Sequence, residues 1–196
     1  YKKSAMENYK DAQYAIANMY FKGIGVDVDY EKALYYFKSS KTEYACFYVG
    51  YIYEKGLGVE QDYKTAIKWY EKSAQMGNSN SAYNLGVMHK MGQGTEVDFE
   101  KAISWYEKAA EKNNENAICN LAMMYRFGEG VEVDYEKSME LYKKAAELGS
   151  ESAICQVGYM YNQGLGVEQD YEKAREWYEK GAILGYPDAQ CNLGYI

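Results

Sequence analysis

The stretch GLGVEQDYEKA, residues 164–174, decides the fold because close copies of it return along the chain. The copies are GIGVDVDYEKA from Gly23, GLGVEQDYKTA from Gly56, GQGTEVDFEKA from Gly92 and GEGVEVDYEKS from Gly128. Their starts are separated by 33, 36, 36 and 36 residues. Self-similarity at a period of this length is the sequence signature of a repeat protein.

Each repeat predicts two helices, and the first lies before the glycines. In the fifth repeat, small or apolar residues at Ala153, Val157, Gly158 and Tyr161 form one face of a 3.6-residue helix. One small-residue slot holds Ala12, Ala45, Ser81, Ala117, Ala153 and Ala189, and five residues later stand Ala17, Gly50, Gly86, Ala122, Gly158 and Gly194. We expect these small residues to let a neighbouring helix approach closely. The Gly-x-Gly segment then ends the helix, because glycine tolerates backbone angles that other residues avoid.

The second helix has its own start and stop signals. Its N-cap candidates are Asp29, Asp62, Asp98, Asp134 and Asp170, whose carboxylates can accept from the free N–H groups of the next turn. The helix carries Tyr36-Phe37, Trp69-Tyr70, Trp105-Tyr106, Leu141-Tyr142 or Trp177-Tyr178. It should end on a left-handed residue at Gly77, Asn113, Gly149 and Gly185. No strand pattern is present in the sequence.

The repeat pattern predicts one continuous array over residues 1–196. Its parts are the end of a preceding repeat at 1–10, five repeats at 11–43, 44–79, 80–115, 116–151 and 152–187, and the start of a sixth at 188–196. Neither end supplies a polar capping element, so we expect a piece of a longer array or end-to-end self-association. The linker SSKTEYA is three residues shorter than its equivalents and lacks the glycine, which predicts a tighter turn there.

Taken together, the pattern Ala-x3-Leu-Gly-x2-Tyr-x2-Gly-x-Gly-Val-x2-Asp-x2-Lys-Ala-x2-Trp-Tyr resembles the Sel1-like repeat, a relative of the tetratricopeptide repeat. The departures are Thr95 for Val, Ser138 for Ala, Leu141 for Trp and His89 for Tyr. The resemblance covers essentially the whole chain. It implies an all-α fold, a right-handed α-α superhelix of helix-turn-helix repeats, and a role in holding another protein.

The resemblance also implies a binding face, because first helices line the concave groove in the tetratricopeptide relatives. Positions two, three, six and nine after the small-residue slot should point away from the packed side. Cys119 and Cys155 stand two residues after the small-residue slot, which we call the second position. The candidate partner-binding residues are Tyr14, Asn18, Phe47, Tyr51, Tyr83, Asn84, Val87, Asn120, Met123, Arg126, Gln156, Tyr159 and Asn192.

The third position, three residues after the small-residue slot, is rich in amides, at Asn84, Asn120, Gln156 and Asn192. An amide both donates and accepts, so a row of amides can pair with the backbone of an extended peptide. The alternative is that these amides bond to the neighbouring helix and stabilise the array. The aromatic residues of the face can equally serve packing between repeats.

Composition and motifs disfavour several other functions. The net charge of −7 argues against nucleic acid and anionic membranes, and no apolar run reaches the ~20 residues of a spanning helix. The glycine loops lack the Lys-Ser/Thr of a phosphate loop. His89 is the only histidine and occupies an aromatic packing slot. We therefore expect no cofactor and no metal.

The four cysteines, Cys46, Cys119, Cys155 and Cys191, predict reduced thiols rather than disulfides. Helices of neighbouring repeats pack about 10 Å apart, whereas the Cα atoms of a disulfide lie within roughly 7 Å. This favours a cytoplasmic setting.

Two further functions stay open beside the scaffold. Some proteins of this family resemble penicillin-binding or β-lactamase-like enzymes, but the Ser-x-x-Lys nucleophile is absent here. The array can also act as a non-binding spacer or regulatory segment of a larger enzyme. The sequence favours a non-catalytic adaptor that binds a peptide or protein.

Overall fold

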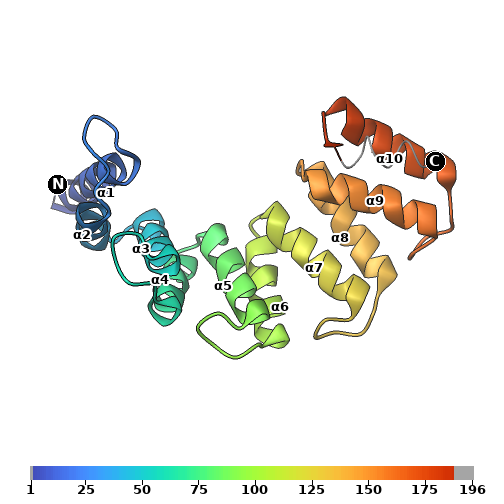
Figure 1. The fold of residues 1–196 in the computed structure, drawn as a ribbon, viewed down its shortest axis with the longest axis horizontal. Coiled ribbons are helices and arrows are strands. Elements are labelled where there is room, and N and C mark those ends of the chain that lie inside the picture. The colour runs from blue at the N-terminus through green and yellow to red at the C-terminus, as the bar shows by residue number, and fades with distance from the viewer. Residues whose placement is uncertain (1, 188–196) are drawn as a thin grey trace. The chain divides into compact units, whose positions relative to one another are not determined.

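The computed structural model describes residues 2–187, which form paired α-helices without a strand (Figure 1). The helices in this part are α1 (Lys2–Lys22), α2 (Tyr30–Ser40), α3 (Glu43–Lys55), α4 (Tyr63–Gln75), α5 (Ser79–Met91), α6 (Phe99–Ala110), α7 (Glu115–Phe127), α8 (Tyr135–Glu147), α9 (Glu151–Gln163) and α10 (Tyr171–Ile183). The odd-numbered helices are the predicted first helices and the even-numbered ones the second helices. The predicted all-α class and its helix-turn-helix pairing are confirmed.

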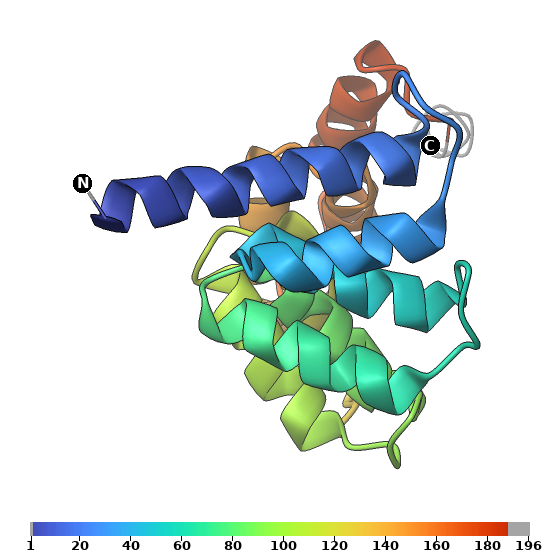
Figure 2. The same cartoon turned by 90° about the vertical axis from the view of Figure 1, so that its left-hand side faces the viewer.

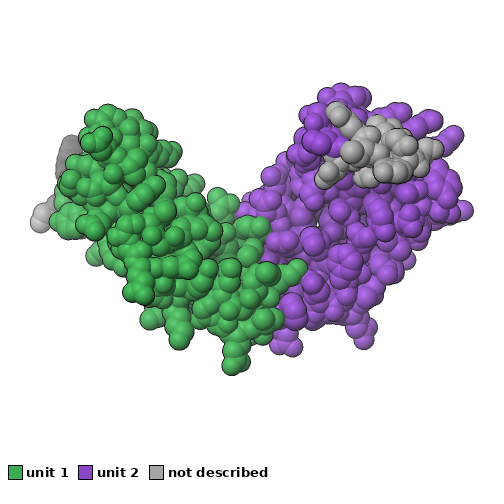
Figure 3. Space-filling view, viewed as in Figure 1, with its two compact units in different colours: residues 1–98 green, residues 99–196 purple. Residues whose placement is uncertain are grey.

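The chain divides into two compact units, residues 1–98 and 99–196 (Figure 3). Within each unit every helix packs on the helices next to it in sequence. The core of unit 1 includes Phe37, Val49 and Ile52, none of which is exposed. In unit 2, Ile118 and Tyr142 are among the buried core residues. Apolar residues at helical spacing therefore form a separate core in each unit.

The loops between first and second helices follow the predicted capping pattern. Asp62 caps α4, since its Oδ1 accepts from the backbone N–H of Thr65 at 3.0 Å. Asp29, Asp134 and Asp170 cap α2, α8 and α10 in the same way. Gly77, Asn113, Gly149 and Gly185 all have positive φ, as predicted for the ends of the second helices.

A backbone hydrogen bond closes each loop. The N–H of Asp62 donates to the carbonyl of Tyr53 at 2.9 Å, and that of Asp98 donates to the carbonyl of His89 at 2.9 Å. The bond at position 89 is made by the main chain, so it does not depend on an aromatic side chain. His89 is buried, which confirms its predicted place in the packing.

The small residues of the first helices admit aromatic rings, as expected. A Cβ added at Gly50 would lie 2.8 Å from Cδ1 of Tyr70, and one added at Gly158 would lie 2.7 Å from Cε1 of Tyr178. Such distances are well inside van der Waals contact. Glycine at both positions therefore lets the tyrosine of the second helix lie directly against the first helix, and an added methyl group would force the ring to shift.

Successive repeats meet through the second glycine of each loop. Gly94 has φ +73°, and a Cβ there would lie 2.5 Å from Cβ of Tyr63, the first residue of α4. In unit 2, Gly130 lies in the same way against Phe99, and Gly166 against Tyr135. Each loop thus rests on the start of the preceding second helix, and any side chain at this glycine would separate the two.

The repeat boundary expected at residue 10 falls inside a single helix. Without a break, α1 continues from Lys2 to Lys22. It lies beside α2 and extends beyond it (Figure 2). A continuous helix satisfies the backbone hydrogen bonds of this stretch locally.

The short linker forms a tight turn, as predicted. Only Lys41 and Thr42 separate α2 from α3, and Lys41 adopts the left-handed conformation at φ +57°. Thr42 caps α3 by accepting from the N–H of Ala45 at 3.3 Å.

Candidate functional site

The predicted face of unit 1 is an aromatic surface on α1 and α3. The ring centroids of Phe47 and Tyr51 lie 6.4 Å apart, and Phe21 lies 6.2 Å from Tyr51. Tyr14 joins them through Tyr48, at 6.2 Å. The structure therefore brings Tyr14, Phe47 and Tyr51 together.

The other predicted residues of unit 1 are more local in their contacts. The Nδ2 of Asn18 donates to the carbonyl of Tyr14 at 3.2 Å, within its own helix. On α5, Tyr83, Asn84 and Val87 are half-buried. Phe47 and Tyr51 on α3 are half-buried as well.

In unit 2, α7 and α9 present the predicted residues side by side. The Nη1 of Arg126 donates to Oε1 of Gln156 at 2.6 Å, and its Cζ lies 4.5 Å from the ring centroid of Tyr159. Met123 and Tyr159 are each 38% exposed, while Asn120 is half-buried. Arg126, Gln156 and Tyr159 are thus assembled into one cluster. Asn192 lies outside the described residues.

Equivalent slots form a linked set in successive repeats. In unit 1 the hydroxyl of Tyr70 donates to Oε2 of Glu54 at 2.6 Å, and Asn84 of the next repeat also contacts this hydroxyl. Burial, followed by the bond to Glu54, raises the pKa of Tyr70. The set has three members. Glu54 is at the ninth position of a first helix, Tyr70 is the buried aromatic residue of the second helix, and Asn84 is at the third position of the next first helix.

The same three slots in unit 2 hold Arg126, Tyr142 and Gln156. Burial raises the pKa of the Tyr142 hydroxyl, and the charge of Arg126 partly offsets this. At the N-terminal end the slots hold only aromatic residues, Phe21, Phe37 and Tyr48, and the last two rings stack at 4.9 Å. Asn84 and Gln156 therefore contact neighbouring helices. For these two residues this agrees with the alternative given above, in which the amides stabilise the array.

The cysteines at the second position were expected to point away from the packed side, and this is wrong for Cys119 and Cys155. They are only 9% and 8% exposed. The Sγ of Cys119 lies 3.2 Å from Oγ of Ser150, the residue before α9, so the segment that starts α9 covers it. Burial is the main cause that raises the pKa of the Cys119 thiol. Among the described residues, Cys46, Cys119 and Cys155 are not joined in a disulfide.

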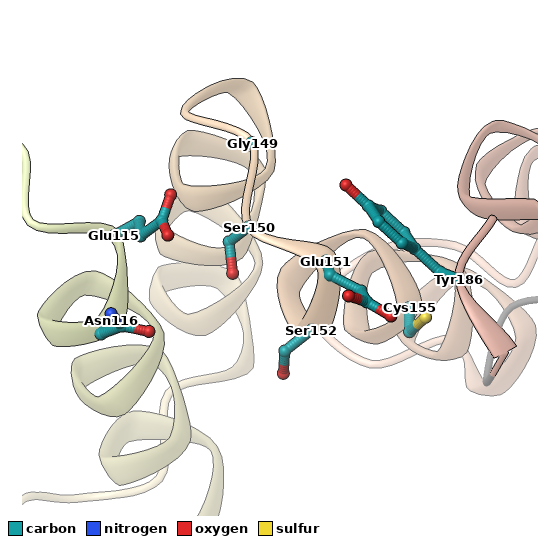
Figure 4. Close-up of a pocket in the computed structure, with 8 residues that line it drawn as sticks. All are labelled: Glu115, Asn116, Gly149, Ser150, Glu151, Ser152, Cys155 and Tyr186. Atoms are coloured by element: carbon teal, nitrogen blue, oxygen red, sulfur yellow. The ribbon is translucent and has the colours of Figure 1, made fainter. Parts of the chain in front are cut away.

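A pocket lies where α7 and α9 begin. Figure 4 shows Glu115 and Asn116 on one side, with Glu151, Cys155 and Tyr186 on the other. A reactive thiolate needs a cationic neighbour or an imidazole base. The lining offers two glutamates instead, and the charge of Glu115 further raises the pKa of the neighbouring Cys119. This pocket does not assemble an activated nucleophile.

Metal-binding clusters and membrane spans are both absent from the described part of the chain. Among the side chains of residues 9–187, no group of three or more His, Cys, Asp or Glu is arranged to hold a metal ion. No helix of that part combines the length and apolar character that crossing a bilayer requires.

The stacked helix pairs, their glycine-mediated contacts and the first-helix face define a helical repeat protein. The Sel1 repeat profile matches residues 10–41, 43–78, 79–114, 116–150, 151–186 and 187–196. The chain belongs to the Sel1 repeat family.

Solved structures agree with this assignment. A Sel1 repeat protein from Oxalobacter formigenes is 31% identical with a TM-score of 0.87, over 95% of this chain and 78% of that one. A protective antigen of uropathogenic Escherichia coli with an SLR fold is 36% identical, with a TM-score of 0.89 over 100% of this chain. The chain spans 42% of the length of that antigen.

A more distant likeness is to cysteine-rich protein B of Helicobacter pylori. It is 27% identical with a TM-score of 0.51, over 65% of this chain and 96% of that one. No match was found among curated proteins.

Proposed function

We propose that this chain is a non-catalytic scaffold that binds a peptide or protein segment on the first helices of its repeats. The observation that carries the proposal is the apolar surface at the sixth position of these helices. Met123 and Tyr159 keep 38% of their surface exposed although both belong to ordered helices. Aromatic and methionine side chains that are held in place but left open are typical of protein-binding surfaces.

The contacts of the amides refine which residues do the binding. Asn84 and Gln156 are engaged by Tyr70 and Arg126, so their polar groups serve the contact between repeats. The surface left for a partner consists of Phe47 and Tyr51 in unit 1, and of Met123, Arg126 and Tyr159 in unit 2. We place the scaffold in a reducing compartment on the basis of its free thiols.

An enzymatic role has less support. The pocket at the start of α7 and α9 contains a thiol and two serines, but its charged lining residues are both acidic. The sequence also contains no Ser-x-x-Lys nucleophile. The resemblance to protein-binding repeats and the open aromatic surface both favour binding over catalysis.

The test is affinity capture from a lysate of the source organism with immobilised wild type and two double variants. Tyr51→Ala with Met123→Ala alters the proposed face. Tyr35→Ala with Met76→Ala removes the same residue types from α2 and from the C-cap of α4, where they are 68% and 46% exposed. Circular dichroism checks that both variants keep the helical content of the wild type.

We expect a protein that is retained by the wild type and the control variant but lost from the Tyr51/Met123 variant. Mass spectrometry identifies it. Equal retention by the two variants would place binding elsewhere on the chain, and the absence of any retained protein would favour a spacer role.

A further inference from the structure

Arg126 is held rigidly on the proposed binding face of unit 2. Its Nη1 donates to Gln156 at 2.6 Å. Its guanidinium lies over two rings, with Cζ 4.5 Å from the centroid of Tyr159 and 4.9 Å from that of Phe127. Contacts from both α7 and α9 fix the plane of this group, so little rotamer entropy remains to be lost when it binds a ligand.

Among the side chains of residues 9–187, no carboxylate forms an ion pair with Arg126. The chain contains one other arginine, Arg175, whose Nε lies 3.5 Å from Oε1 of Glu179. In the slot equivalent to Arg126, Glu54 is paired with Lys55. A guanidinium has five N–H donors, whereas Arg126 contacts two polar partners, Gln156 and the hydroxyl of Tyr142. The remaining donors can bind a planar anion.

The surroundings of Arg126 are apolar and open to a partner. Phe127 is 57% exposed, and Met123 and Tyr159 are each 38% exposed. A partner that covers these side chains also removes water from the guanidinium. In the lower dielectric that results, a charge-assisted hydrogen bond gains strength.

We propose that Arg126 binds the carboxylate side chain of an Asp or Glu within an extended segment of a partner protein, while a neighbouring apolar side chain of that segment packs on Met123 and Tyr159. Planar bidentate pairing with a carboxylate is the interaction for which arginine geometry is suited. The inference rests on the proposed function and specifies in addition that the bound segment carries an acidic side chain.

The net charge of −7 does not prevent this pairing. At physiological ionic strength, charges further apart than about 8 Å are largely screened when they are exposed to solvent. A carboxylate in contact with Arg126 therefore interacts mainly with that residue. The negative charge of the rest of the chain reduces the association rate more than it reduces the strength of the contact.

The experiment is a selection from end-blocked heptapeptides on immobilised protein, with sequencing of the retained peptides by mass spectrometry. The pool is randomised at every position and contains phosphoserine beside the standard residues. Acetylated and amidated ends remove terminal charges, so the only carboxylates present are side chains. The same selection is run on Arg126→Gln, Arg126→Lys and Arg175→Gln.

We expect the wild type to enrich peptides with Asp or Glu next to an apolar residue, with affinity about tenfold above that of the matching Asn or Gln peptides. Arg126→Gln should lose this preference, Arg126→Lys should keep part of it, and Arg175→Gln should behave as wild type. Retained peptides without an acidic preference would overturn the inference but leave the binding function intact. Enrichment of phosphoserine above Glu would also overturn it, and retention of no peptide by any protein would count against the proposed function itself.

A second measurement follows binding of the selected peptides in solution. Because the chain has two arginines, the Nε–Hε region of its nitrogen-correlated NMR spectrum should contain two side-chain signals. Titration with a selected acidic peptide should shift the Arg126 signal saturably and leave that of Arg175 in place. Equal shifts of both signals would show non-specific association and would overturn the assignment.

Discussion

The hydroxyl of Tyr70 donates a hydrogen bond of 2.6 Å to Oε2 of Glu54, and this bond connects the two helices of one repeat. Tyr70 is not exposed at all, whereas its partner carboxylate is half-buried. The same slots hold Phe21 with Phe37 near the N-terminus and Arg126 with Tyr142 in unit 2. The framework thus keeps its geometry while the chemistry of the ninth position changes from apolar to acidic to basic.

Tyr70→Phe should lower the free energy of unfolding by about 1–2 kcal/mol, because it leaves a half-buried carboxylate oxygen without its donor. Tyr35→Phe is the matched control, since Tyr35 is 68% exposed. Urea unfolding followed by circular dichroism measures both. Equal stability of the two variants would show that the bond to Glu54 contributes nothing.

Gly158→Ala should destabilise the chain by about 1–3 kcal/mol, because the new methyl group would overlap Cε1 of Tyr178. Ala122 stands in the same slot of the preceding repeat, so alanine itself is compatible with a helix at this position. Adding Tyr178→Leu to the variant should recover part of the loss. Additive effects of the two substitutions in thermal unfolding would argue against a direct clash.

Stability should fall at low pH through the aspartate caps. Hydrogen bonds from Thr65 hold the pKa of Asp62 below its ordinary value of 3.8, and Asp29 and Asp170 are lowered in the same direction. A lowered folded-state pKa gives stability that is present above the unfolded pKa and is lost as pH falls through the folded pKa. The melting temperature should therefore decrease below about pH 4.

Asp62→Asn tests this origin of the pH dependence. Asparagine still caps the helix but does not titrate, so the variant should show a shallower decrease in melting temperature over the same pH range. An unchanged slope would assign the acid sensitivity to other carboxylates.

The thiols should react slowly in the folded protein. Burial raises the pKa of Cys46 and of Cys119, and Cys155 is only 8% exposed. In a Cys191→Ser variant, Ellman's reagent should label the three remaining cysteines much more slowly in buffer than in urea at the same pH. Fast stoichiometric labelling in buffer would contradict the burial of these side chains.

The repeat architecture was predictable from sequence because its determinants are local. Aspartate caps, left-handed glycines and aromatic residues at fixed spacing each specify their own turn or face, and Asp62, Gly77 and Tyr70 all have the predicted roles. The continuous helix α1 could not be predicted from residue types. Asn8 occupies the same slot as Asn113, the left-handed residue in the turn after α6, but Asn8 lies within a helix. The same residue type is compatible with either state.

The candidate site was only partly predictable, because it depends on contacts between repeats. Helical spacing placed Arg126, Gln156 and Tyr159 on one side of their helices, and the structure brings them together. Helical spacing could not show that Gln156 accepts a hydrogen bond from Arg126, or that Ser150 covers Cys119. These contacts join residues about 30 positions apart. That no described carboxylate pairs with Arg126 also becomes visible only when the neighbouring side chains are placed.

The second glycine of each loop has a consequence for how such arrays can be recombined. Gly94 rests on Tyr63, and Gly130 rests on Phe99, so part of every repeat boundary is made by a loop and the second helix of the repeat before it. A crossover placed between two repeats therefore cuts through this contact and brings together a loop and a helix start from different parents. A crossover placed after the second glycine of a loop and before the next second helix, for example between Gly94 and Phe99, keeps each loop with the helix start on which it rests. The natural exchange unit of this chain is thus the second helix of one repeat with the first helix and loop of the next.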